Sequence, residues 1–370
     1  MNAISAPFRY QPDYAIRPGE LIQEYLEHLE ISARELARRC GRSAKLITEI
    51  ILGKAPIEPE TALQLERVLQ LDASIWLGLE AKYRLHLARE AEDEELARHE
   101  AWAKRFPVQA LHERDWLGSN SGGASLVRDV LRFFGVGSIE AYDTRLRELL
   151  AVDYRTSPTY LSHPEALAAW LRIGELKAAE IAPKDYDRDA FVKALKAIRP
   201  LTLVPIEEAV AKVQDYCASA GVAFVLEQSL GKIAASGISR WLSPRRALIQ
   251  QTGRYLRDDH FWFTFFHECA HLLLHSRKII FIDLQKGKGS ATLQQEREAN
   301  DWAADFLIPA SAMRKFLRSF EETEEEVEAF AEQVGVAPGI VVGQLQHRGV
   351  IGFNQMNHLR QKFVWVSDGD

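Results

Sequence analysis

The chain has 370 residues, of which 47% are hydrophobic and 26% charged, and its formal net charge is −6 at pH 7. This length predicts two or three domains, and the composition excludes collagen-like, low-complexity and extensively disordered proteins. The acidic balance also excludes a protein coated in basic surface for indiscriminate nucleic-acid binding, although a small DNA-reading surface needs only a few well-placed groups.

Cysteine usage and the distribution of apolar segments indicate the compartment. The three cysteines, Cys40, Cys217 and Cys269, are far apart in the sequence, so they offer neither a disulfide framework nor a zinc-knuckle spacing and fit a reducing environment. Residues 1–18 lack the pattern of a signal peptide. The most apolar stretch, 261–274, contains two histidines and is too short to span a bilayer. We therefore expect a cytoplasmic protein with no membrane partner.

The first 90 residues read as short helices separated by clear turns. Ser32 and Glu35 have the spacing of a capping box, in which the serine caps the helix and the glutamate reaches back. Gly41 ends that helix, and Ser43 begins the next one, which ends at Gly53. Two short helices joined by a glycine turn form the helix-turn-helix arrangement, which presents its second helix to the DNA major groove. The same arrangement also occurs in helical bundles that bind no DNA.

Polar side chains on and before this second helix are the candidate DNA contacts. Lys45 and Thr48 suit phosphate or base-edge contacts, while arginines near the turn suit the DNA backbone. The full candidate set is Arg38, Arg42, Ser43, Lys45, Thr48 and Glu49. The segments 31–37, 46–51 and 76–80 resemble Cro/repressor-type domains, most closely the HigA-type antitoxins (XRE class). The resemblance implies a five-helix unit that binds a double-stranded DNA operator, usually as a homodimer on a palindromic site.

The middle of the chain is predicted to be helical and to lead into a small sheet. Residues 88–105 form a charged helix with little to bury, typical of a solvated connector; 118–123 are a loop, and 125–220 have helical periodicity. Short apolar segments bounded by Gly, Ser and Pro predict strands at 222–226, 237–242 and 247–251. The last of these strands is a candidate edge for binding an extended peptide.

The apolar segment that follows the predicted strands contains a candidate metal site. Because His267 and His271 are four residues apart, they lie above one another on one helix face and both rings can reach one ion. Glu268 follows the first of them and is placed to act as a general base toward water at that ion. Cys269 lies on the opposite face and is expected in the core. This spacing predicts one Zn²⁺ per chain, with Glu268 as the catalytic residue.

A second helical segment supplies a candidate third ligand. Glu296 and Asn300 are four residues apart and share a face, so the carboxylate can bind the metal while the amide orients a ligand histidine. Glu298 lies on a different face and is expected in solvent. If His275 also bound the metal, the site would be closed and non-catalytic, so we expect His275 to support a ligand or to be structural.

At these residues the chain resembles the ImmA/IrrE family of metallopeptidases. The matching features are the run 261–275, Glu296, the pair Ala299-Asn300 and the apolar-proline turn 307–309, and the resemblance covers roughly residues 125–310. It implies a gluzincin-like pair of helices holding one zinc, and a protein substrate that is commonly a repressor or an antitoxin. Trp302 stands where a phenylalanine is usual, away from the chemistry.

Two further features of a peptidase have weaker candidates. Stabilising the oxyanion of the reaction requires hydrogen-bond donors. Arg254, Tyr255 and His347 are conceivable donors, although a surface or packing role is favoured for each. Residues 278–290 are either a flap over the site or a plain solvated loop. A second helical hairpin is predicted at 325–345, with its turn at 336–339.

Together these features predict a mainly α protein with a small β-sheet (α+β). The expected domains are a helix-turn-helix domain at 1–88, a charged helical linker at 89–122, a helical region at 123–220, a peptidase core at 221–310 and a C-terminal helical hairpin and tail at 311–370. The predicted function is a DNA-binding regulator fused to a zinc endopeptidase that acts in a stress, phage-defence or toxin-antitoxin response. The alternative is an antitoxin-like transcription factor whose zinc-binding half is a sensor or toxin-like module without proteolysis.

Overall fold

The computed structural model describes residues 15–118, 122–151, 163–181, 184–231, 233, 235–275, 281–284 and 290–364. These residues form two compact units. The smaller unit comprises the chain up to Ala103 together with Gly118–Asp129, and the larger comprises Lys104–Leu117 together with the chain from Val130 onward.

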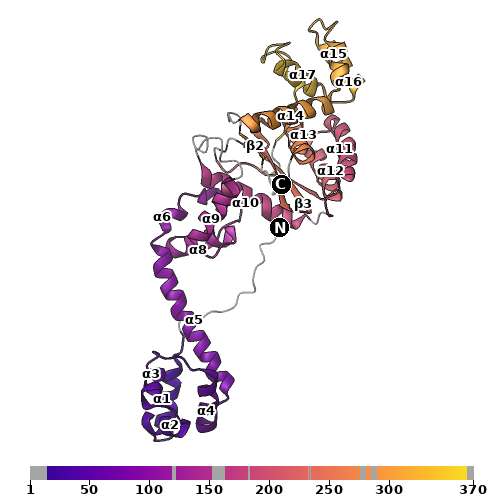
Figure 1. The fold of residues 1–370 in the computed structure, drawn as a ribbon. Helices are drawn as coiled ribbons and strands as arrows, with labels where there is room; N and C mark the ends of the chain where they lie inside the picture. Colours follow the sequence, from indigo (N-terminus) through magenta and orange to yellow (C-terminus); the bar gives the residue numbers. More distant parts are fainter. Residues whose placement is uncertain are drawn as a thin grey trace. The chain divides into compact units, whose positions relative to one another are not determined.

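The smaller unit is a helical bundle packed around a single core (Figure 1). Its core includes Leu36, Ile47, Leu65 and Trp76, all fully buried, and the Trp76 indole N–H donates to the carbonyl oxygen of Leu71 at 3.1 Å. These residues recur at helical spacing, so one apolar face of each helix meets its neighbours. The helices are α1 (Pro18–His28), α2 (Ala33–Cys40), α3 (Ala44–Ile51), α4 (Pro59–Leu69), α5 (Ala73–Ala97) and α6 (Glu100–Ala103).

The boundaries of α2 and α3 are fixed by local hydrogen bonds. The Ser32 hydroxyl accepts from the backbone N–H of Glu35, and the Ser43 hydroxyl accepts from that of Leu46, each at 3.1 Å. Gly41 ends α2 in the left-handed conformation, with φ +66°, which glycine adopts without steric cost. The predicted helix-turn-helix boundaries are therefore confirmed.

The predicted capping box at the start of α2 is only half formed. The Ser32 half is present, but the Glu35 carboxylate pairs instead with Arg38 at 2.8 Å and with Arg39 at 2.8 Å. Charge-assisted bonds to guanidinium groups are stronger than a bond to a neutral backbone N–H, so the glutamate turns toward the arginines. The hydrogen bonds from Arg38 and then Arg39 lower the pKa of Glu35 to about 2.

The charged segment predicted as a connector belongs to a longer helix. α5 begins at Ala73 inside the bundle and continues to Ala97, so its last turns, which are exposed, extend the final helix of the bundle. Within the same unit, Asp93 on α5 forms an ion pair with Arg128 of α8 (Gly123–Phe134). Of the predicted loop at 118–123, residues 119–121 lie outside the described part of the chain.

The larger unit contains a four-stranded sheet in the order β1-β3-β2-β4. β1 pairs parallel with β3, and β2 pairs antiparallel with both β3 and β4. β1, β2 and β3 confirm the three predicted strands, whereas β4 lies inside a segment interpreted as a loop or flap. The structure contradicts the prediction that 247–251 offers an edge, because β3 has a neighbour on each side. The strands are β1 (Val222–Leu226), β2 (Ala235–Ser243), β3 (Arg246–Gln251) and β4 (Phe281–Leu284).

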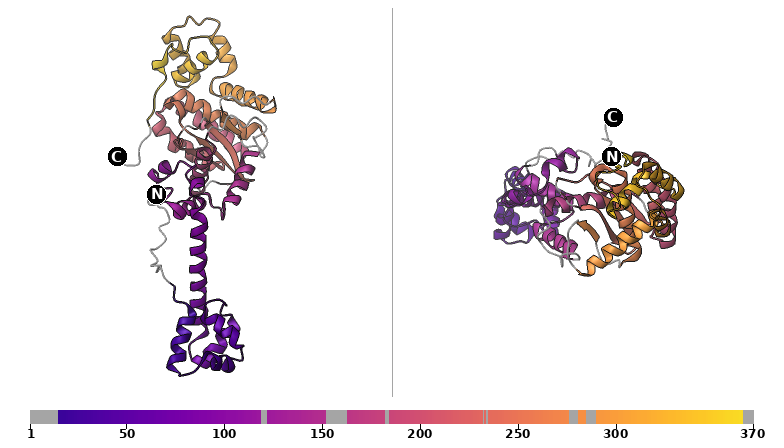
Figure 2. Two further views of the ribbon diagram at one scale, coloured as in Figure 1. Left: turned by 90° about the vertical axis from the view of Figure 1, so that its left-hand side faces the viewer. Right: turned by 90° about the horizontal axis from the view of Figure 1, so that it is seen from above.

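Helices cover both faces of this sheet (Figures 1 and 2). Val222 and Phe224 of β1 pack with α12 and α13 in the main core, whereas Ala223 and Val225 pack with α10 on the opposite face, as expected when alternate residues of a strand point to opposite sides. In chain order the helices of this unit, with η marking 3₁₀ turns, are α7 (Val108–Glu113), α9 (Ile139–Ala151), α10 (Pro164–Glu180), α11 (Arg188–Ile198), η3 (Arg199–Leu203), α12 (Ile206–Ser219), η4 (Arg254–Leu256), α13 (Asp258–Leu274), α14 (Ser290–Leu307), α15 (Ala310–Phe316), α16 (Glu324–Val334), α17 (Pro338–His347) and η5 (Asn357–Leu359).

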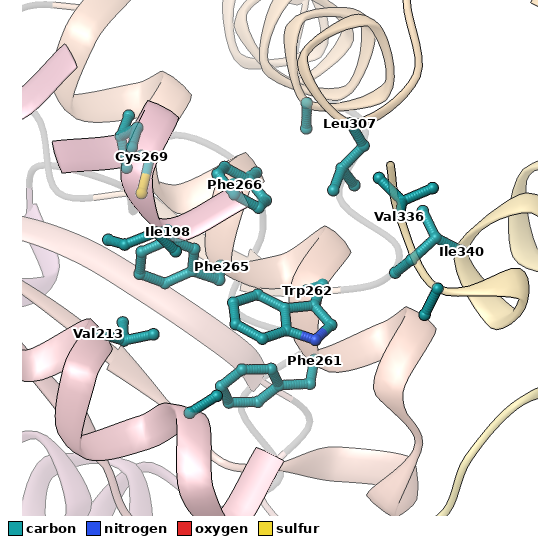
Figure 3. Packing of buried hydrophobic residues seen from close by; sticks show 14 of the residues in the cluster. Ile198, Val213, Phe261, Trp262, Phe265, Phe266, Cys269, Leu307, Val336 and Ile340 are labelled. Atoms are coloured by element: carbon teal, nitrogen blue, oxygen red, sulfur yellow. The ribbon is translucent and has the colours of Figure 1, made fainter. Parts of the chain in front are cut away.

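Helix α13 is the centre of the larger core (Figure 3). Its aromatic residues Phe261, Trp262, Phe265 and Phe266 are buried against neighbouring helices and the sheet, so the backbone that bears the histidines is held rigidly. Cys269 is fully buried among them, as predicted, and burial raises the pKa of its thiol well above the ordinary value. The cysteine is therefore a packing residue.

The C-terminal hairpin is formed as predicted. α16 and α17 pack on each other, and Val327, Phe330 and Val341 join the main core. A capping box between Thr323 and Glu326 begins α16. None of the helices in the described ranges is both long and apolar enough to traverse a membrane.

Candidate metal centre

Three side chains from α13 and α14 converge on one small space. His267 Nε2 lies 2.9 Å from His271 Nε2. The two Glu296 oxygens lie 3.2 Å from His267 Nε2 and 3.4 Å from His271 Nε2. Both histidines are buried, while the Glu296 side chain is 31% exposed. Within the described part of the chain, this is the grouping of His, Cys, Asp and Glu side chains whose ligand atoms are close enough to hold a metal ion.

These distances fit the geometry of a zinc ion. Nitrogen and oxygen ligands about 2.0–2.1 Å from a tetrahedral zinc lie about 3.3 Å from one another, close to the separations between the Glu296 oxygens and the two imidazoles. Two imidazoles and a carboxylate are also the donor set of catalytic zinc sites that keep one position for water or substrate. The residues present therefore fit this metal.

The charge states of the ligands suit a cation. Burial lowers the pKa of His271 to about 4, so its imidazole is neutral at pH 7. Burial alone would raise the pKa of Glu296, but hydrogen bonds with His267 and His271 outweigh it and lower the pKa to about 2. A neutral imidazole and an ionised carboxylate are the forms that bind metal, so no proton has to be removed from these two groups at neutral pH.

Asn300 supports the first histidine from behind. Its side-chain oxygen lies 3.0 Å from His267 Nδ1, one turn along α14 from Glu296. An amide oxygen can only accept, so Nδ1 carries the proton, and with a metal bound the neutral ring would present its lone pair at Nε2, on the side of Glu296. The structure thus places Asn300 where the sequence analysis expected an orienting amide.

A similar chain supports the second histidine. His271 Nδ1 lies 2.9 Å from His275 Nδ1, and His275 Nε2 lies 3.2 Å from Glu298 Oε2. If His271 donates from Nδ1 and His275 donates from Nε2 to the carboxylate, His271 Nε2 is left as the metal-binding atom. His275 contacts the face of His271 that points away from Glu296, so it is placed as a support.

The contribution of Glu298 was missed in the sequence. Its side chain is 47% exposed, as expected, yet one oxygen accepts from His275 and the other from Gln294 at 2.8 Å. The identification of this partner depends on how α13 and α14 lie against each other, and spacing within either helix does not encode that. The only local signal is that Glu298 is two residues beyond a candidate ligand.

Glu268 lies on the sheet side of α13, where it is fully buried. A methyl group built on Gly237 of β2 would lie 2.9 Å from Glu268 Oε1 and 2.7 Å from Thr264 Cγ2. The carboxylate is therefore confined between its own helix and the backbone of β2. Gly237 is a site residue that the sequence analysis did not identify, because it was read as an ordinary strand boundary.

The candidate DNA-binding side chains lie on α3 and the turn before it, apart from Arg38, which lies on α2. Ser43, Lys45 and Thr48 are exposed. Lys45 Nζ lies 3.8 Å from Glu49 Oε1, and the Thr48 hydroxyl donates to the Ala44 carbonyl at 2.8 Å.

Two of the arginines already have partners within the smaller unit. Arg42 Nε donates to Gln64 Oε1 at 2.7 Å, and Arg38 pairs with Glu35. Both contacts restrict the mobility of the arginines, and the Glu35 carboxylate also offsets the charge of Arg38. Lys45 is the more exposed cation, at 84%.

Both the N-terminal and the C-terminal part of the chain are similar to known proteins. Residues 238–346, which include the converging side chains, match the IrrE N-terminal-like domain family, peptidase M78. The N-terminal part is 35% identical over 77 residues to the uncharacterized HTH-type transcriptional regulator YddM of Escherichia coli (strain K12), covering 21% of this chain and 82% of that protein. The chain is a helix-turn-helix regulator with an ImmA/IrrE-type peptidase domain. This confirms both resemblances.

Two further matches to the N-terminal part cover a similar share of this chain. Virulence-associated protein I of Dichelobacter nodosus is 38% identical over 77 residues, covering 20% of this chain and 71% of that protein. The solved structure of an addiction module antidote protein of a HigA family from Coxiella burnetii is 28% identical, covers 22% of this chain and 91% of that chain, and has a TM-score of 0.21.

The candidate oxyanion donors lie in other segments of the sequence than the converging ligands. Arg254 and Tyr255 are in the η4 turn, where the guanidinium lies over the tyrosine ring at 5.0 Å. His347 ends α17 and lines a cavity together with Asn300. Most of the candidate flap, including 285–289, lies outside the described residues.

Proposed function

We propose that this regulator binds operator DNA through α3 and that its ImmA/IrrE-type domain is a zinc endopeptidase. Its substrate is a partner repressor or antitoxin, or the chain itself. The observation that carries the proposal is the convergence of His267, His271 and Glu296, with the buried carboxylate of Glu268 on the same helix. His267, His271 and Glu268 are buried polar groups, and such groups cost free energy unless they have a ligand or well-formed hydrogen bonds.

The proposed mechanism assigns each residue a separate task. His267, His271 and Glu296 would hold the metal, and Asn300, His275 and Glu298 would keep the two imidazoles in the binding tautomer. When bound, zinc supplies a Lewis acid that polarises the scissile carbonyl and allows water to attack at neutral pH. Glu268 accepts the proton of the attacking water and returns it to the leaving nitrogen. The confinement of Glu268 beside Gly237 fixes the position of this base.

The DNA-binding part is proposed on its exposed residues. Lys45 and Thr48 lie on the outer face of α3 and would contact phosphates or base edges, with Ser43 at the N-terminus of the helix. We propose a homodimer on a palindromic operator. Joining both activities in one chain would raise the effective concentration of the peptidase around repressors bound at the same operator.

The peptidase proposal is tested with Glu268→Gln in the full chain. We expect wild type and variant to bind one zinc each, measured by plasma mass spectrometry, because Glu268 is not a ligand. New protein N-termini should appear in cells that express the wild type and be absent with the variant, as read by N-terminal labelling and peptide mass spectrometry.

Three outcomes decide among the alternatives. Equal cleavage by Glu268→Gln would exclude Glu268 as the general base. A chain that binds zinc but yields no new N-termini would favour a regulator whose zinc site is a sensor or toxin-like module. A purified chain that binds no zinc would contradict the metal centre itself.

The DNA proposal is tested with Lys45→Ala, using Lys82→Ala on the exposed surface of α5 as the matched control. A phosphate contact predicts weaker binding to operator and non-operator DNA alike, and a salt dependence whose slope is shallower by about 1. Unchanged affinity for the operator upstream of the gene would remove α3 from the DNA interface.

A further inference from the structure

Three residues form an apolar stripe along the outer face of α3. Ala44, Thr48 and Leu52 follow one another at intervals of four residues, so their side chains lie above one another on one helix face. All three are exposed, Leu52 by 48%, and Leu52 continues the helical pattern by donating its backbone N–H to the Thr48 carbonyl. The buried residues of α3 are its three isoleucines, which belong to the core of the smaller unit. Core packing therefore does not explain the stripe.

The hydroxyl of Thr48 is turned toward its own helix. It donates to the Ala44 carbonyl at 2.8 Å, and this bond uses the single hydrogen that a hydroxyl can donate. In this conformation Thr48 has no hydrogen left to donate to a base, and its methyl group is the apolar group that it offers outward. The stripe therefore presents the Ala44 methyl, the Thr48 methyl and the Leu52 isobutyl group.

An exposed cation flanks the stripe. Lys45 is next to Ala44 and is 84% exposed, and its Nζ lies 3.8 Å from Glu49 Oε1, a separation at which an exposed ion pair is weak. An apolar stripe beside a cation matches the DNA major groove, because phosphates line the groove and thymine exposes a methyl group inside it.

We propose that α3 reads thymine methyl groups, and that the operator places thymines where Ala44, Thr48 and Leu52 contact them. Ala44 and Leu52 are eight residues apart, which is about 12 Å of helix and matches about three to four base-pair steps of about 3.4 Å. Lys45 would contact a phosphate beside these bases. This inference rests on the proposed DNA binding and deepens it, because it names the base feature that α3 recognises.

The test replaces thymine with uracil, which lacks the methyl group and keeps the same hydrogen-bonding groups. A sequence that the full chain binds is first selected from a random-sequence duplex library. Its thymines are then replaced one at a time by deoxyuridine, and affinity is measured by fluorescence anisotropy. We expect at least one replacement to weaken binding about fourfold, the effect of losing one methyl group that is buried on binding.

The failure of this inference differs from the failure of DNA binding. A library from which no sequence is enriched would contradict sequence-specific DNA binding, and this inference with it. A selected sequence without thymine, or one whose uracil duplexes all bind as well as the parent, would overturn the reading of thymine methyl groups while DNA binding stands.

Variants of Thr48 separate its methyl group from its hydroxyl. Thr48→Ser loses the methyl group, whereas Thr48→Val keeps it and loses the hydroxyl, and the exposed position should tolerate both changes. We expect Thr48→Ser to bind the thymine duplex about fourfold more weakly than wild type and to lose nothing further when uracil replaces the thymine that Thr48 contacts. Thr48→Val should bind more tightly than Thr48→Ser and stay sensitive to uracil. The reverse order of affinities would assign base reading to the hydroxyl and overturn the proposal.

Leu52→Ala tests the far end of the stripe, with Leu63→Ala on α4 as the matched control. The two leucines are exposed to a similar degree, 48% and 45%, but Leu63 lies outside α3. We expect Leu52→Ala to weaken binding and to abolish the effect of uracil at one position, and Leu63→Ala to do neither. If Leu52→Ala instead lowers the oligomeric state in sedimentation while every uracil effect remains, Leu52 contacts a second copy of the chain and is excluded from the DNA interface.

Discussion

The hydrogen bond from Asn300 to His267 offers a direct test of the metal centre. Asn300→Ala removes the acceptor 3.0 Å from His267 Nδ1 and leaves the three ligand side chains in place. Loss of such a supporting group typically lowers metal affinity 10- to 100-fold, which corresponds to about 1.4–2.7 kcal/mol. We expect zinc binding to weaken by this amount, measured by competition with a chromophoric chelator.

The same change has a predictable thermal consequence. Zinc at a free concentration of 100 times its Kd stabilises the folded chain by about 2.7 kcal/mol, and a tenfold loss of affinity reduces this by about 1.4 kcal/mol. For a unit of this size, that difference lowers the zinc-dependent rise in Tm by about 3–6 °C.

Arg297→Ala, at an exposed position of the same helix, is the matched control and should leave both values unchanged. Zinc affinity of Asn300→Ala within twofold of wild type would show that the amide does not orient the ligand.

Three other predictions address separate parts of the chain. Gly237→Ala places a methyl group 2.9 Å from Glu268 Oε1, so we expect a loss of cleavage of about 100-fold with zinc content unchanged, and normal cleavage would contradict the confinement of the base. Burial raises the pKa of Asp258 to about 6 from 3.8, so its contribution to stability is present below pH 3.8 and lost as pH rises through 6. Asp258→Asn should therefore gain at most about 3 kcal/mol relative to wild type between pH 4 and pH 7 in urea titrations, and parallel pH profiles would refute this. Ser43→Ala removes the cap of α3 and should cost about 1 kcal/mol in the unfolding of the smaller unit, whereas an unchanged urea midpoint would show that the cap contributes nothing.

The candidate metal-binding side chains were readable from the sequence because helical periodicity places each group on one face of its own helix. His267 and His271 share a face by their spacing of four, and Glu296 was preferred to Glu298 because it shares a face with Asn300. The structure places these side chains together as expected. Each inference used one helix at a time, which is the range over which sequence spacing determines geometry.

Features that depend on contacts between elements could not be read in this way. The bond between His275 and Glu298 and the position of Gly237 beside Glu268 depend on how α13 packs on α14 and on β2. The interior position of β3 follows from a parallel pairing with β1, which no local pattern encodes. Glu35 pairs with Arg38 and Arg39 and leaves its expected capping position. Sequence spacing does not determine which of these partners the carboxylate selects.

The ion pairs of Glu35 with Arg38 and Arg39 have a consequence for how the regulator would search the chromosome. The single carboxylate of Glu35 offsets one of the two positive charges that Arg38 and Arg39 place near the proposed recognition helix. Fewer counterions would therefore be released on random DNA, and nonspecific retention would be shorter. Rapid dissociation from wrong sites would leave the choice of operator to the base contacts of the proposed recognition helix.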